Sequence, residues 1–144
     1  MTVTLRPVEP ADLPILFEHQ RDPVANAMSG VPARDHAAFT AHWERIMADE
    51  TVVIRAVVAD GRLAGSVLSF LHDGRREVGY WIAREHWGGG IASAALAAFL
   101  AVETRRPLYA GVLESNQGSL RVLEKCGFER AGTEGDMITL VLGV

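Results

Sequence analysis

The sequence predicts one α/β domain over residues 1–144, in which about four helices flank a central sheet that is mixed but mostly antiparallel. Three observations support this fold class. The length of 144 residues is that of a single domain. An apolar content of 49% with 22% charged residues is typical of a globular chain with a core. Segments with strand and helix periodicity follow one another in an order that suits helices packed on one sheet.

The first third of the chain is predicted to form one strand and two helices. Alternating residues predict a short strand over 3–8. Apolar residues at helical spacing predict helices over 12–20 and 35–49, and Asp35 can cap the second. Between them, residues 21–34 are rich in Pro, Gly and Ser and are predicted to be a loop.

The middle of the chain is predicted to contain three antiparallel strands in succession. They are expected over residues 51–59, 62–72 and 77–83, which are rich in Val and Ile. An Asp-Gly pair at 60–61 and another at 73–74 separate them. Because Asp-Gly suits a two-residue hairpin turn, consecutive strands should pair directly.

The last third is predicted to alternate helices and strands. Residues 91–105 read as a helix stopped by a proline, and 108–113 as a strand. A helix over 117–126 ends at a glycine, and strands over 128–131 and 137–142 follow.

Composition narrows the partners and the location. The net charge of −4 argues against nucleic acid as the main partner. The single cysteine, Cys126, cannot form an internal disulfide, which favours a reducing compartment. We find neither a signal sequence nor an apolar stretch long enough to span a bilayer, so we expect a cytoplasmic protein without a membrane partner. The histidines show no metal-ligand spacing, so no metal site is predicted.

Three glycines, Gly88-Gly89-Gly90, lie between a predicted strand and a predicted helix. Glycines allow close approach of a ligand, and the first N–H groups of a helix, at the positive end of its dipole, bind phosphates readily. The segment is neither a P-loop, because no Gly-Lys-Ser/Thr follows, nor a dinucleotide fingerprint. A tight structural turn remains the alternative interpretation.

A second motif lies downstream, beyond the strand predicted over 108–113. It contains Asn-x-x-Ser at 116–119 and Glu-Lys-x-Gly-Phe at 124–128. Together with the glycine turn, in this order, it resembles the GNAT superfamily of acyl-CoA N-acyltransferases over nearly the whole chain. The His-Trp-Gly sequence at 86–88 is similar to the branch of ribosomal-protein N-terminal alanine acetyltransferases.

The resemblance implies acetyl-CoA (coenzyme A) as cofactor. Backbone amides from Gly88 to Ala92 would hold the pyrophosphate, although Trp87 stands where the family usually has Arg or Gln. The splayed strand from Trp81 to Ala83 would pair with the pantetheine amides. Asn116 and Ser119, in the motif after the next strand, would lie near the thioester. The cofactor-binding residues implied are Trp81, Ile82, Ala83, Trp87, Gly88, Gly89, Gly90, Ile91, Ala92, Asn116 and Ser119.

The resemblance also implies the catalytic groups. Glu77 is the candidate base, acting directly or through water, and its alternative is a solvated carboxylate beside two arginines. Relatives often carry a tyrosine that acts as general acid where this chain has Leu123. Ser119 is therefore the candidate for hydrogen bonding to the departing sulfur. Its alternative is a residue that satisfies local backbone groups at a helix start. A backbone N–H near Trp81 or Ile82 is expected to stabilise the oxyanion, and Tyr80 is expected to pack.

The function indicated is an N-acetyltransferase that moves acetyl from acetyl-CoA directly to a primary amine. The acceptor is a protein or peptide N-terminus or a small molecule, and the resemblance implies that the first two helices and their loop wall its site. Two alternatives stay open, a non-catalytic acetyl-CoA-binding module and an antibiotic or polyamine acetyltransferase. Arg121 and Lys125 share a helix face that either meets the cofactor's ribose phosphate or is simply solvated. An apolar, unprotected edge at 137–142 makes a homodimer plausible.

Overall fold

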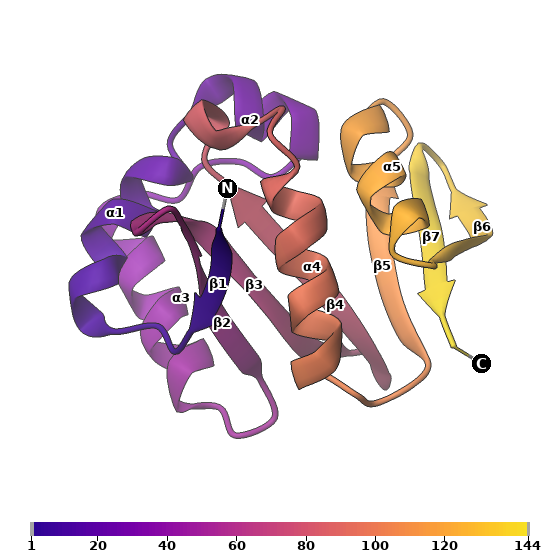
Figure 1. Cartoon of the computed structure of the whole chain (residues 1–144), viewed down its shortest axis with the longest axis horizontal. Helices are drawn as coiled ribbons and strands as arrows, with labels where there is room; N and C mark the ends of the chain where they lie inside the picture. The colour runs from indigo at the N-terminus through magenta and orange to yellow at the C-terminus, as the bar shows by residue number, and fades with distance from the viewer. Residues whose placement is uncertain (1, 144) are drawn as a thin grey trace.

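The computed structural model describes residues 2–143, so the first and last positions of the predicted 1–144 domain lie outside the described residues. Within residues 2–143 the chain forms one seven-stranded sheet and five α-helices (Figure 1). The strands are β1 (Val3–Arg6), β2 (Val53–Ala59), β3 (Arg62–His72), β4 (Arg75–Ile82), β5 (Leu108–Leu113), β6 (Glu129–Glu134) and β7 (Met137–Leu142). The helices are α1 (Leu13–His19), α2 (Pro23–Ser29), α3 (His36–Ala48), α4 (Ile91–Val102) and α5 (Gln117–Lys125).

The sheet order is β1-β2-β3-β4-β5-β7-β6. Neighbouring strands pair antiparallel except β4 and β5, which are parallel. The prediction of a mixed, mostly antiparallel sheet is therefore confirmed. Parallel strands need a crossover connection, and α4 supplies it.

Both Asp-Gly pairs form the predicted two-residue hairpins. Asp60 and Gly61 have φ angles of 50° and 81°, and Asp73 and Gly74 have 49° and 76°. Two successive residues with positive φ fit the type I′ turn that matches the twist of the flanking strands. These turns fix the register of β2, β3 and β4, and β3 has the predicted bounds.

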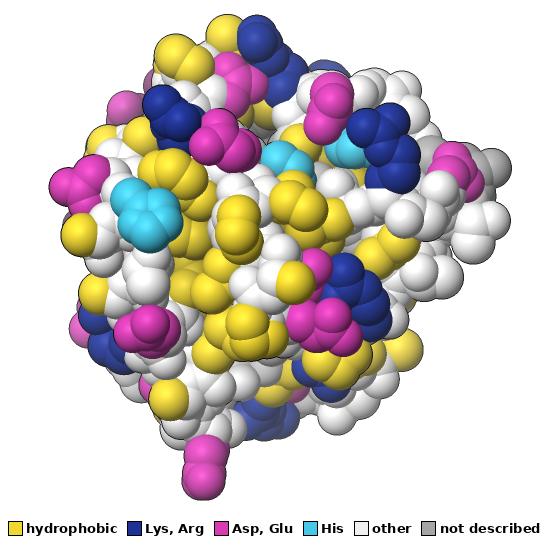
Figure 2. Space-filling model, turned by 90° about the vertical axis from the view of Figure 1, so that its left-hand side faces the viewer, with side chains coloured by type: hydrophobic (Ala, Val, Ile, Leu, Met, Phe, Trp, Pro, Cys, Tyr) yellow, Lys and Arg dark blue, Asp and Glu magenta, His cyan; other side chains and the backbone are white. Residues whose placement is uncertain are grey.

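Helices cover both faces of the sheet (Figure 1). On one face α4 and α5 pack on the main core, where Leu96, Phe99 and Leu108 are completely buried. On the other face α1 and α3 enclose a smaller cluster around Phe39 and Trp43. Figure 2 shows the side of the molecule beside these two helices, where hydrophobic side chains gather between charged ones.

Two predictions for the helices are wrong in detail. Residues 21–34 contain the helix α2 rather than only a loop. Asp22 caps α2 by accepting from the Val24 N–H at 3.0 Å, Pro23 occupies its first position, and Gly30 ends it with a φ of 75°. The helix predicted to reach residue 105 ends at Val102.

The prediction of an unprotected edge at 137–142 is also wrong. In the described sheet β7 lies between β5 and β6, so β6 forms that edge instead. All six residues of β6 are exposed, and they include Glu129, Arg130 and Glu134. Charged side chains discourage edge pairing, so this edge does not favour a homodimer.

The end of α4 lies against a buried charge, Glu103, which is 2% exposed. It accepts hydrogen bonds from Ser69 Oγ at 2.5 Å and Arg105 Nη2 at 2.9 Å, and Arg76 Nε lies 3.8 Å away. Burial alone would raise the pKa of Glu103, but the hydrogen bonds from Arg105 and Ser69 outweigh it and hold the pKa below its ordinary value. Glu103 therefore stabilises the fold above the ordinary glutamate pKa of 4.5, and this contribution is lost as the pH falls through the lowered value.

We therefore expect the free energy of unfolding in urea to fall when the pH is lowered from 7 to 3. A Glu103→Gln variant should lose about 3 kcal/mol at pH 7, because it leaves buried arginine charge unpaired. It should also lose less on acidification than the wild type. An equal acid-induced loss in both proteins would show that Glu103 does not carry this dependence.

Candidate functional site

The parallel strands β4 and β5 separate soon after they meet. Their pairing is confined to Glu77 and Tyr109, so the end of β4 from Tyr80 onward has no partner on that side. The Ala83 N–H donates to the Ala64 carbonyl of β3 at 2.8 Å. Because backbone groups alternate in direction along a strand, those of Tyr80 and Ile82 point into the gap.

A cavity of about 660 Å³ occupies this gap. Its walls come from α2, the end of β4, the segment before α4, the first turn of α4, and one side of α5 with the segment before it. Tyr80 and Trp81, which point to opposite faces of the sheet, both line it, so the cavity reaches both faces. The lining residues are Ala25, Met28, Ser29, Tyr80, Trp81, Ile82, His86, Trp87, Gly88, Gly90, Ile91, Ala92, Ser93, Ser115, Asn116, Gln117, Gly118, Ser119, Arg121, Val122 and Lys125.

The glycine turn leads into the N-terminus of α4, which opens on this cavity. Gly88 and Gly90 have φ angles of 82° and 80°, a conformation that favours glycine. Gly90 is the N-cap of α4, and no side chain within residues 2–143 caps it. The first N–H groups of α4 are therefore available to an anion, at the positive end of the helix dipole.

The indole of Trp87 holds the turn in place, since its Nε1 donates to the Ile82 carbonyl at 2.8 Å. This bond leaves the Ile82 N–H pointing into the gap. Of the residues assigned to the cofactor, Ala83 and Gly89 are not among those that line the cavity. The Ala83 N–H is used within the fold, as described above, so Ala83 has no free donor.

The start of α5 faces the end of β4 across the cavity. Asn116 caps α5, and its Oδ1 accepts from the Ser119 N–H at 3.2 Å. The Ser119 hydroxyl lies 2.6 Å from the Tyr80 hydroxyl instead of bonding to local backbone. Tyr80 packs against the main core, as the sequence predicts. Alternation along β4 correctly gives the face of Tyr80 but not the approach of α5.

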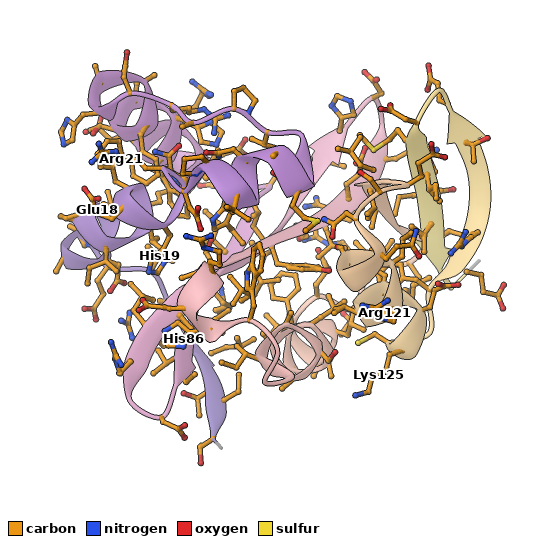
Figure 3. All side chains as sticks on the ribbon, turned by 90° about the horizontal axis from the view of Figure 1, so that it is seen from above. Glu18, His19, Arg21, His86, Arg121 and Lys125 are labelled. Atoms are coloured by element: carbon orange, nitrogen blue, oxygen red, sulfur yellow. The ribbon has the colours of Figure 1, made fainter. Side chains whose placement is uncertain are left out.

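The charge of the cavity wall is entirely basic. Arg121 and Lys125 extend from the same side of α5 and line the cavity (Figure 3). Among the described residues that line it, there is no Asp or Glu. Such a wall suits an anionic ligand and disfavours a polycation.

Glu77 lies outside the cavity lining. It is half-buried on the face of β4 that also carries Trp81. Between them lies Gly79, where an added Cβ would meet only Phe70 Cε1, at 3.8 Å. The surface from Glu77 to the cavity is therefore clear of intervening side chains from β4.

Two contacts that the sequence did not reveal tie the first helices to the cavity wall. The Trp81 Nε1 donates to the His19 carbonyl at the end of α1, at 3.2 Å. Arg84 Nε lies 2.8 Å from Asp22 Oδ2, beside the cap of α2. Sequence periodicity carries no signal for such contacts between segments far apart in the chain.

Within residues 2–143, no group of three His, Cys, Asp or Glu side chains is arranged to hold a metal ion. No helix in the same range has the length and apolarity needed to cross a bilayer. Burial raises the pKa of Cys126, so its thiol is held protonated.

Comparison with known sequences gives two matches. A family model described as the acetyltransferase (GNAT) domain matches residues 2–129. The probable N-acetyltransferase YjcK of Bacillus subtilis (strain 168) is 36% identical over 104 residues. The match covers 65% of this chain and just over half of that relative, 57% of its length.

Comparison with solved structures gives closely similar folds. The aminoglycoside acetyltransferase AAC(6')-Ib in complex with coenzyme A superposes with a TM-score of 0.83 at 21% identity, covering 98% of this chain and 94% of that one. An acetyltransferase from Thermus thermophilus also gives a TM-score of 0.83 at 21% identity, covering 99% of this chain and 97% of that one. At this identity the likeness establishes the fold.

Proposed function

Because the chain belongs to the GNAT family of acetyltransferases, as the family match over residues 2–129 shows, we propose that it transfers the acetyl group of acetyl-CoA to a primary amine. The observation that carries this proposal is the cavity between β4 and β5. It is basic, it meets an uncapped helix N-terminus, and it reaches both faces of the sheet. The two substrates can thus approach the gap from opposite faces.

The proposed position of the cofactor follows from the backbone N–H groups at the start of α4 and along the edge of β4 that have no partner within the described part of the chain. Its pyrophosphate lies at the first amides of α4, next to Gly88 and Gly90. The pantetheine arm runs along the unpaired edge of β4 as an added strand would. The thioester then lies near Ile82 and Ser119, with the basic side chains of α5 beside the phosphates.

The transfer itself needs a neutral amine, a stabilised tetrahedral oxygen and a leaving thiolate. The Ile82 N–H, held in place by the sheet and by Trp87, is the proposed oxyanion donor. Ser119 is the proposed hydrogen-bond donor to the sulfur. Glu77 is the proposed base and acts through water, because it does not line the cavity.

The acceptor we propose is the α-amino group of a peptide or another amine with uncharged surroundings. An α-amino group has a pKa of about 7.7 to 8.0, so much of it is neutral near pH 8 without a strong base. The α2 part of the wall is formed by Ala25, Met28 and Ser29, none of which attracts a cation. Asp22, the nearest carboxylate on that segment, is paired with Arg84.

The similar structure AAC(6')-Ib acts on aminoglycosides, as its name says. An aminoglycoside carries several positive charges, and the α2 part of the wall, formed by Ala25, Met28 and Ser29, offers no carboxylate to bind them. We therefore rank aminoglycosides and polyamines below peptide amines as acceptors. The ribosomal-protein branch remains a proposal that rests on the His-Trp-Gly sequence at 86–88.

An amine panel tests the proposed function. The protein would be incubated with acetyl-CoA and peptides of varied first residue, lysine peptides, small amines or kanamycin. Mass spectrometry of the acceptor avoids the background that the Cys126 thiol would give with thiol reagents. Acetylation of a peptide α-amine in preference to kanamycin is expected, and the reverse preference would overturn the acceptor assignment.

One observation favours a second candidate, a non-catalytic acetyl-CoA-binding module. Leu123 stands where relatives often carry a tyrosine as general acid. It is 1% exposed and belongs to the core. Tight binding of acetyl-CoA without acetylation of any amine in the panel would favour this module over the enzyme.

The assignment of Arg121 predicts a ligand-dependent loss. An Arg121→Gln variant should bind acetyl-CoA about fivefold more weakly, because an exposed ion pair contributes up to about 1 kcal/mol. The loss should vanish with acetyl-dephospho-CoA, measured by calorimetry, if the guanidinium meets the ribose phosphate. Arg130→Gln, which removes a charge paired with Glu124 outside the cavity, is the matched control. Equal losses with both ligands would contradict the assignment.

A further inference from the structure

Two hydroxyl groups meet in the wall of the cavity. The Tyr80 hydroxyl on β4 lies 2.6 Å from Ser119 Oγ on α5, and both residues line the cavity. The contact joins the two elements whose separation creates the site. It is not needed to start α5, because Asn116 already caps that helix.

The chemistry of the pair decides which oxygen donates. A phenol, with a pKa of about 10, is a stronger acid than an aliphatic hydroxyl and is the better donor. Burial raises the pKa of Tyr80, against the opposing effect of the Ser119 hydrogen bond. The phenol therefore stays protonated at neutral and mildly alkaline pH. Either hydroxyl of the pair can donate in this contact, and the stronger acidity of the phenol favours donation from Tyr80 to Ser119 Oγ.

Donation by Tyr80 determines where the serine proton goes. A hydroxyl has one proton and two acceptor lone pairs, so Ser119 Oγ accepts from the phenol and keeps its own proton for another partner. The Ser119 backbone is fixed because its N–H donates to Asn116 Oδ1. The serine proton is then directed away from Tyr80, toward the open cavity, and hydrogen bonds in series strengthen one another.

We propose that Tyr80 is a positioning residue that orients the Ser119 hydroxyl so that its proton faces the departing sulfur of coenzyme A. This inference rests on the proposed acetyl transfer. In that step the amine nitrogen bonds to the acetyl carbon and the carbon–sulfur bond breaks, with its electron pair going to sulfur. The nitrogen loses one proton to the proposed base, Glu77, through water. The thiolate, stabilised by the Ser119 hydrogen bond, takes one proton from solvent.

This arrangement gives the serine a role that Leu123 cannot fill. The core position of Leu123 leaves no acid at the usual place on α5, whereas the Tyr80–Ser119 pair lies one helical turn earlier. The tyrosine reaches the serine from the neighbouring strand, so the hydroxyls of β4 and α5 act as a unit.

Kinetics of a double-mutant cycle test the proposal. Tyr80→Phe keeps the ring and should lower kcat about tenfold, with the KM for acetyl-CoA within about twofold of the wild type. Ser119→Ala should lower kcat at least as much, and the double variant should fall no further than Ser119→Ala alone. Tyr109→Phe, which changes the chain's other tyrosine outside the cavity, is the matched control and should keep wild-type kcat.

A spectroscopic titration gives a readout independent of turnover. In the Tyr109→Phe background Tyr80 is the one tyrosine of the chain, and its ionisation can be followed by phenolate absorbance. Adding Ser119→Ala should raise the Tyr80 pKa further, because it removes the hydroxyl that turns and donates to the phenolate once Tyr80 ionises, and this donation lowers the pKa. An unchanged titration would show that the contact is absent in solution and would overturn the proposal.

The outcomes separate this proposal from the function on which it rests. Absence of turnover by the wild type would overturn the proposed function and this inference with it. Turnover by the wild type with unchanged kcat in Tyr80→Phe would overturn this inference alone. Additive losses in the double variant would do the same, because they would mean that the two hydroxyls act separately.

Discussion

A Ser93→Glu variant is expected to bind acetyl-CoA at least about 100-fold more weakly than the wild type, because two negative charges at close range in a partly enclosed site repel by several kcal/mol. Ser93 lines the cavity at the third position of α4, where the cofactor's pyrophosphate is proposed to lie. The new carboxylate would also reach back to the free N–H groups of the helix start and compete with the phosphate for them.

The same substitution should leave the fold intact. A glutamate in the first turn of a helix is favourable, so the thermal midpoint of Ser93→Glu should equal or exceed that of the wild type. Ser93→Gln is the matched control, because it has nearly the same volume without the charge. Equal affinity of the two variants, measured by calorimetry, would show that the anionic part of the cofactor does not lie at this helix end.

A Glu77→Gln variant is expected to lower kcat about 100-fold near pH 7, the usual contribution of a general base. The KM for acetyl-CoA should change little, because Glu77 lies outside the cavity lining. The defect should shrink as the pH rises above the amine pKa, since the acceptor is then already neutral. Acetylation rates of one peptide across pH, followed by mass spectrometry, measure both effects.

Glu129→Gln is the control for this variant, because Glu129 is an exposed carboxylate on the edge strand β6. A Glu77→Gln enzyme with wild-type kcat would assign Glu77 to the solvated surface of the sheet. A defect that stays constant with pH would also contradict the role of a base, and would indicate a structural effect of the substitution.

Much of the fold could be predicted because its signals are local. The Asp-Gly pairs at 60–61 and 73–74 specify their turns through two residues that tolerate positive φ, and they fixed the order of three strands. The glycine turn before α4 is likewise specified by the residues within it. The helix α2 also had its signals, in a capping Asp22, Pro23 and Gly30, but the Pro, Gly and Ser composition of that segment obscured them.

The rest depends on contacts between distant segments. The strand β7 follows β6 in the chain and inserts between β5 and β6, which an apolar strand does not reveal by itself. The hydrogen bond between Tyr80 and Ser119 requires α5 to pack against the end of β4. Alternation along one strand gives the sheet face on which a side chain lies. It does not predict which residue of another element will contact that side chain.

The most direct test of a cofactor held between β4 and β5 is an acetyl-CoA titration followed by backbone amide NMR, for which a chain of 15.6 kDa is well suited. We predict binding with the largest shifts at the amides of Ile82, Gly88, Gly90 and Ile91 and at the start of α5. Saturation without shifts at these amides, or no binding at millimolar acetyl-CoA, would contradict a cofactor held between β4 and β5.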